Sequence, residues 1–187
     1  MFAHGKHFLQ SEIDEGKSIL ESMIHRFPNI LKGEIAYYET IIKEEARIAA
    51  QGDIDIKLSY EHNSPYNGVI DFQENVLVYY YSSLAIMIYT YGESSLKHIC
   101  EYAKINIKNI KKDKLKRYYS KLKDKYVTLP ELDKIWSGRG AFQNIRNKIT
   151  HERATLNQKA TQEYLSQNLN EVYKMLCVVL NEVINSK

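Results

Sequence analysis

The chain has 187 residues, of which 44% are hydrophobic and 26% are charged, and its formal net charge at pH 7 is +3. This composition excludes an intrinsically disordered chain, and the length suits one domain that buries a core without disulfides or metal ions. Only eight glycines and three prolines are present, which leaves few turns and favours long elements. We therefore expect residues 1–187 to form a single all-α domain, a helical bundle.

Two helices are expected within the first 50 residues. Apolar side chains recur at helical spacing over 11–27 and again over 30–50, and Pro28 lies between these stretches. Because a proline inside a helix removes one backbone hydrogen bond, we expect the helix to break or kink there.

The segment 54–72 has a different pattern. Apolar and polar residues alternate over 54–60, as in a half-buried strand, and a turn-rich stretch separates them from the apolar residues of 69–72. The sequence favours a small β-hairpin inserted between helices, with an irregular loop as the alternative.

The remaining elements are expected to be helical. The stretch 74–103 is apolar on nearly all sides in its first half, which is typical of a central buried helix. A lysine-rich segment, 104–125, is predicted to form the next helix, and a further helical segment begins near Ala141. The last helix is expected over 160–184, with an apolar seam for bundle packing. The seam residues are Leu165, Leu169, Val172, Leu176, Leu180 and Val183. The fold expected is therefore a bundle with a core of four to five helices.

The two cysteines, Cys100 and Cys177, lie in apolar helical stretches without a Cys or His at metal-ligand spacing. We expect reduced thiols in the core, with a zinc site or a disulfide as the minor alternative. The first ten residues lack the apolar run of a secretory signal, and the most apolar run, 76–89, is too short to cross a bilayer. We therefore expect a cytoplasmic protein that does not enter a membrane.

Positive charge is concentrated between Lys104 and Lys125. This segment contains ten lysine and arginine residues and two aspartates, a net charge of +8, so the rest of the chain carries −5. A dense basic segment on a nearly neutral protein is typical of a surface that binds a polyanion, and a solvated lysine-rich helix is the equal alternative. Two tyrosines of this segment, Tyr118 and Tyr119, could stack on unpaired bases, but a place in the core is the favoured alternative.

One histidine lies in a run that could carry chemistry. In FQNIRNKITHE, residues 142–152, Arg146 precedes His151 by five positions and Asn147 follows the arginine directly. If the run is helical, its apolar residues share one face, Asn147 and His151 share the opposite face, and Arg146 lies at the flank. The alternative is an exposed histidine beside a solvated arginine. The other five histidines have no such neighbours, and we expect them to be structural or exposed.

The run from Ile145 to His151 resembles the signature of the HEPN superfamily, in which an arginine and a polar residue, often asparagine, precede a histidine by a short gap. As in that family, the run lies shortly before the last long helix. The stretch 88–96 resembles the family's second core helix, whose inward-facing acidic residue would here be Glu93. The resemblance covers residues 74–187 in pattern, although the residues after His151 lack the glycine that many relatives carry there.

The resemblance implies a metal-independent endoribonuclease that needs no cofactor. The ribose 2′-hydroxyl would attack the adjacent phosphate and leave a 2′,3′-cyclic phosphate and a 5′-hydroxyl. In this reaction His151 would transfer protons and Arg146 would stabilise the charge that develops on the phosphate. Asn147 would orient His151 or donate to the phosphate, and Glu93 would position Arg146.

The same resemblance implies a homodimer whose motifs face each other across a twofold axis. It also implies a toxin or anti-phage defence effector that an antitoxin or another partner protein keeps inactive. The basic segment would guide RNA to the site between the protomers. The residues expected to contact RNA are Lys111, Lys112, Lys114, Lys116, Arg117, Arg139 and Arg153.

Two other functions fit the sequence. One is a non-catalytic HEPN-like helical module that binds a partner protein, a nucleotide or RNA, in which Arg146 and His151 are structural. The other is an unrelated helical bundle that binds RNA through its basic segment. The first predicts no cleavage of RNA, and the second predicts binding that falls steeply with salt concentration.

Overall fold

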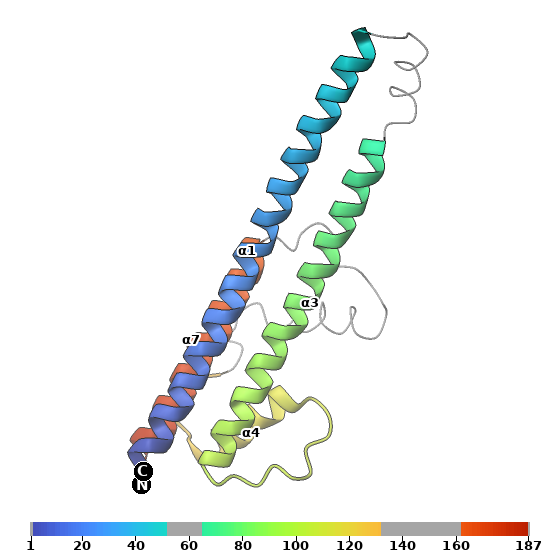
Figure 1. Ribbon diagram of the computed structural model, residues 1–187. Coiled ribbons are helices and arrows are strands. Elements are labelled where there is room, and N and C mark those ends of the chain that lie inside the picture. The colour runs from blue at the N-terminus through green and yellow to red at the C-terminus, as the bar shows by residue number, and fades with distance from the viewer. Residues whose placement is uncertain (1, 52–64, 132–161, 187) are drawn as a thin grey trace.

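The computed structural model describes residues 2–51, 65–131 and 162–186, which form an all-α bundle (Figure 1). These ranges contain no strand, so the predicted fold class is confirmed. The helices described are α1 (Phe2–Gln51), α3 (Pro65–Tyr102), α4 (Lys114–Lys125) and α7 (Gln162–Asn185).

Three of these helices pack against one another. α1, α3 and α7 each contact the other two, and α4 packs on α3. α3 runs antiparallel to α1, because Tyr80 Oη donates to the carbonyl of Met23 at 2.7 Å and Tyr91 Oη donates to that of Ile13 at 2.7 Å. The predicted seam of α7 is confirmed, since all six of its residues are at most 1% exposed. The core therefore lies where α1, α3 and α7 meet.

The prediction of two helices in the first 50 residues is wrong. α1 is continuous over 50 residues and contains Pro28, which is buried. Proline has no N–H to donate to the carbonyl of Ile24, four residues earlier. The side chain of Gln162, the first residue of α7, supplies the missing donor: its Nε2 lies 3.0 Å from the oxygen of Ile24. A tertiary contact thus replaces the backbone bond that the proline removes.

The predicted hairpin partner is also wrong. Residues 69–72 lie inside α3, which begins at Pro65, whereas residues 54–60 lie outside the described residues. A proline is favourable in the first turn of a helix, because the N–H it lacks has no partner there in any case. The apolar residues 69, 72 and 76 also have helical spacing, so the run that resembled a strand continues the central helix.

The basic segment is helical in its second half only. α4 begins at Lys114, and residues 103–113 form an irregular connection between α3 and α4. Both cysteines are free, but only Cys100 lies in the core as expected, and Cys177 is half-buried. Burial raises the pKa of the Cys100 thiol to about 12, which keeps it protonated at neutral pH.

α1 and α3 approach each other closely at Gly16. A Cβ at this position would lie 2.7 Å from one atom of the Tyr91 ring and 2.9 Å from another. The ring cannot easily retreat, because its hydroxyl is hydrogen-bonded to the carbonyl of Ile13. Gly16 therefore provides the space that the Tyr91 ring fills between the helices.

In Figure 1, α1 and α3 continue together past the N-terminal end of α7. We call residues 29–51 of α1 the arm. None of the helices in the described ranges has the length and apolar character needed to span a membrane.

We expect the loss of the Gln162 amide to be costly only while Pro28 is present. Gln162→Ala leaves the carbonyl of Ile24 without this donor and should lower the free energy of unfolding by about 1–3 kcal/mol. In a Pro28→Ala background the N–H of residue 28 can donate to the Ile24 carbonyl in place of the Gln162 amide. Gln162→Ala should therefore lower the free energy of unfolding much less in that background. Urea unfolding of the four proteins, followed by circular dichroism, measures this coupling. An equal cost in both backgrounds would contradict the proposed compensation.

We expect Gly16→Ala to destabilise the protein although alanine favours helices. The added Cβ overlaps the Tyr91 ring, and overpacking of this kind costs about 1–3 kcal/mol. Gly33→Ala on the same helix is the matched control, because a Cβ there meets nothing within 4 Å. This control should instead stabilise the protein by up to about 1 kcal/mol through helix propensity. Thermal unfolding of both variants tests the difference, and equal stability would show that the contact at Gly16 is unimportant.

Candidate functional site

The catalytic run predicted from the sequence lies outside the described residues. The site residues concerned are Arg139, Arg146, Asn147, His151 and Arg153. Their roles stay predictions. The structure does describe the helix that follows the run, since α7 begins at Gln162, eleven residues after His151. The hydrogen bond from Gln162 to α1 and the buried seam of α7 fix the position of this helix in the bundle.

Glu93 lies on α3 at the junction with α4. Its Oε1 is 3.6 Å from the Nζ of Lys114, the first residue of α4, and its side chain is 25% exposed. An ion pair at this exposure contributes at most about 1 kcal/mol. The neighbouring Gly92 allows close packing here, because a Cβ would lie 3.0 Å from Val172 and 3.3 Å from Leu115. Glu93 thus sits near the point where three helices converge, and its predicted contact with Arg146 stays a prediction.

The basic segment presents a charged face to solvent. On α4, Leu115, Tyr118, Tyr119 and Leu122 are buried, and the lysine and arginine residues lie on the other side of the helix. The predicted RNA contacts within the described residues are all exposed: Lys111, Lys112, Lys114, Lys116 and Arg117.

Several cations of this segment are already engaged within the protein. Lys114 pairs with Glu93, Lys123 pairs with Glu131, and Lys125 Nζ donates to the carbonyl of Ala103 at 2.7 Å. Five others, on α4 and just before it, form no ion pair with any described residue, and we call them the open basic face. The open basic face comprises Lys111, Lys112, Lys116, Arg117 and Lys121.

The two tyrosines of α4 do not stack on bases. Tyr118 is 5% exposed and Tyr119 is 3% exposed, so the core alternative is confirmed. Burial raises the pKa of Tyr119 to about 12, and the nearby carboxylate of Glu131 adds to the shift. The sequence signal for the buried face of α4 was the spacing of its apolar residues, which follow one another at steps of three, one and three positions.

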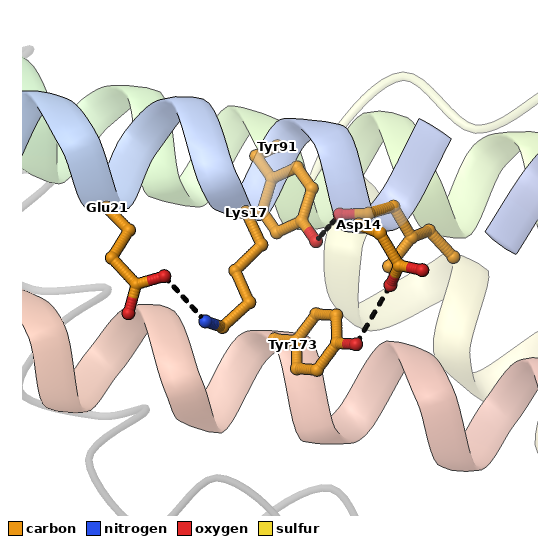
Figure 2. Close-up of polar contacts among 6 residues, drawn as sticks. Asp14, Lys17, Glu21, Tyr91 and Tyr173 are labelled. Atoms are coloured by element: carbon orange, nitrogen blue, oxygen red, sulfur yellow. Dashed lines mark hydrogen bonds and ion pairs between the residues drawn. The ribbon is translucent and has the colours of Figure 1, made fainter. Parts of the chain in front are cut away.

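A polar cluster between α1 and α7 is not evident from the sequence (Figure 2). Tyr173 Oη donates to Asp14 Oδ1 at 2.8 Å, and Gln10 Nε2 donates to the same oxygen at 2.8 Å. The Nζ of Lys17 lies 5.4 Å from the centre of the Tyr173 ring, within range of a cation–π contact. The hydrogen bond to Asp14 is the main cause of the raised pKa of Tyr173, which stays a neutral donor. The cluster therefore joins two helices and provides no activated nucleophile.

A shallow groove of about 280 Å³ runs between α1 and α3. Its lining includes Leu9, Ile13, Gly16, Ile19, Tyr91 and His98. At its edge, His98 Nδ1 lies 3.5 Å from Glu12 Oε2, and both side chains are about half exposed. Within the described residues, no group of histidine, cysteine and acidic side chains is arranged to hold a metal ion. The groove is mainly apolar, and its lining residues come from α1 and α3 and include none of the open basic face.

The arrangement of the described residues can therefore attract a polyanion through one face and bury an apolar side chain through another. No family model, curated protein or solved structure matches the chain.

Proposed function

We propose that the protein is a metal-independent endoribonuclease that cleaves RNA by transesterification. The observation that carries the proposal is the run Arg146-Asn147-x-x-x-His151, which resembles the HEPN signature and precedes a long helix of an all-α bundle. The open basic face supports it, because exposed lysines and arginines that form no ion pair with the described residues favour phosphate binding.

The proposed reaction needs proton transfer and charge stabilisation. A base removes the proton of the ribose 2′-hydroxyl, and the oxygen forms a bond to the adjacent phosphorus. The bond from phosphorus to the 5′-oxygen breaks, and that oxygen takes up a proton. His151 suits the proton transfers, since an imidazole titrates near neutral pH, and Arg146 suits the phosphate oxygens through its planar fork of donors. Asn147 orients His151 or donates to the phosphate, and Glu93 positions Arg146.

In this proposal two protomers pair so that their catalytic runs share one site. The resemblance also favours a toxin or anti-phage effector in the cytoplasm, held inactive by a partner protein. RNA approaches along the open basic face, with Arg139 and Arg153 as further phosphate contacts.

A second candidate is RNA binding without cleavage. It is favoured by the basic face and by the ion pair between Glu93 and Lys114, which engages the carboxylate proposed to position Arg146. The two candidates share the same binding surface and differ only in whether the bound RNA is cut.

We expect the purified protein to cleave RNA in excess EDTA and to leave 2′,3′-cyclic phosphate and 5′-hydroxyl ends. His151→Ala should lower the rate by about 100-fold or more, because a positioned general acid or base contributes about 10²–10⁴-fold. Mass spectrometry of the products and a gel assay of the rates measure both. Cleavage that EDTA abolishes, or that persists in a folded His151→Ala protein, would refute the proposal. A folded wild type that binds RNA without cutting it would favour the second candidate.

We expect RNA binding to depend on the open basic face in both candidates. Replacing Lys111, Lys112 and Lys116 with Gln should weaken binding of single-stranded RNA and lower the slope of log K against log salt by about 0.7 for each phosphate that the protein no longer neutralises. The control replaces Lys32, Lys43 and Lys174, three exposed lysines on α1 and α7, and changes the net charge equally. Fluorescence anisotropy at several salt concentrations measures both slopes. Equal weakening in the two variants would mean that the net charge of the protein, rather than this face, binds RNA.

A further inference from the structure

Among the α1 side chains that the structure describes, five large apolar ones are each more than half exposed: Phe8, Ile19, Ile30, Tyr37 and Ile48. They follow one another at steps of 11, 11, 7 and 11 residues. An α-helix turns about 100° per residue, so a step of 11 rotates a position by only about 20° and a step of 7 returns it by about the same angle. All five side chains therefore lie within about 40° of one another on the same side of the helix. We call this set the α1 stripe.

The first half of the stripe adjoins the groove between α1 and α3. Ile19 lines the groove, together with Leu9 and Ile13 of the same helix. The second half lies on the arm. One molecule thus carries both an apolar hollow and a row of exposed apolar side chains that could fill such a hollow. This row begins about 16 Å further along the same helix.

Four of the five stripe residues are placed symmetrically about Pro28, and Ile30 is the exception. Phe8 and Ile48 each lie 20 positions from Pro28, and Ile19 and Tyr37 each lie nine positions from it. We propose that α1 pairs antiparallel with α1 of a second copy of this chain, with the twofold axis at Pro28. Phe8 then faces Ile48 of the second copy, Ile19 faces its Tyr37, and each contact occurs twice, as an isologous interface requires.

The symmetry distinguishes a second copy from other occupants. In a parallel pair each residue would lie opposite the same residue of the other copy, so residues at equal distances on both sides of Pro28 would not be required. A helix of a different protein would not require such equal distances either. The position of Pro28 agrees with the antiparallel pair, since any bend it introduces in α1 occurs at the same point in both copies. The arm of each copy then lies along the groove of the other.

Charges beside the stripe fit this register at its centre. Ile30 faces the aliphatic stem of Arg26 of the second copy, and the guanidinium of that arginine comes within one helical turn of Glu34. The contact occurs twice, and both side chains are exposed in the single chain.

One like-charged pair, Glu12 facing Glu44, also results. Arg47 already binds Glu44 at 2.7 Å and lowers the pKa of its carboxyl. This arginine reduces the repulsion between the two carboxylates.

The stripe is large enough for a specific interface. It spans about 40 residues and is therefore about 60 Å long, and a helix face about 10 Å wide gives about 600 Å² per copy. The total of about 1,200 Å² is at the lower end of the range of stable protein interfaces.

This interface does not rest on the ribonuclease proposal, because none of its residues belongs to the candidate catalytic run. Sedimentation of the full chain tests it. We expect a dimer for the wild type and for His151→Ala, and a dissociation constant at least about 30-fold higher for Ile19→Glu and for Tyr37→Glu, as for interface hot spots. Val127→Glu is the matched control, since Val127 is exposed and lies outside the stripe. A monomeric wild type, or equal weakening by Val127→Glu, would overturn the proposal.

Cross-linking tests the register without any need to break the dimer. Ile19→Cys and Tyr37→Cys are made in a Cys177→Ser background, while Cys100 is buried. A short bifunctional thiol reagent should join the two variants when they are mixed, because positions 19 and 37 face each other. Neither variant should cross-link alone, since equivalent positions are about 27 Å apart along the antiparallel pair. Efficient cross-linking of either variant alone, or none in the mixture, would overturn the antiparallel pairing.

Discussion

The hydrogen bond from Gln162 to the carbonyl of Ile24 connects the two halves of the structure. Pro28 removes the backbone donor that this carbonyl would otherwise accept, and the first side chain of α7 replaces it. The bond fixes the level at which α7 enters the bundle, and from there its apolar seam follows α1 and α3 down the core. The candidate catalytic run precedes α7 in the sequence and lies outside the described residues.

The helical fold could be predicted from apolar spacing, but the continuity of α1 could not. Pro28 is a strong local signal for a helix break, and its compensation comes from Gln162, a residue 134 positions away. Tertiary contacts of this kind override local preferences and leave no trace in a window of neighbouring residues. The prediction of a strand at 69–72 was wrong for a related reason. A short apolar run is compatible with both the two-residue period of a strand and the 3.6-residue period of a helix. Pro65 can be identified as the first residue of a helix only once the helix itself is known.

The exposure of the basic residues could be predicted from their density along 104–125, and their role in RNA binding stays a prediction. The partner of Glu93 could not be found from the sequence. The link between Asp14 and Tyr173 joins positions 159 residues apart and was likewise invisible. The roles of Arg146 and His151 come from a resemblance and from no measured contact.

The contacts of α7 also determine when the bundle can form during synthesis. Gln162 and Cys177 meet residues of α1 that were made 138 and 167 positions earlier. Until α7 leaves the ribosome, the apolar sides of α1 and α3 that it covers stay exposed, and the core cannot close cooperatively. The candidate catalytic run is translated before this helix, so a nascent chain can contain that run while the core of the bundle is still open.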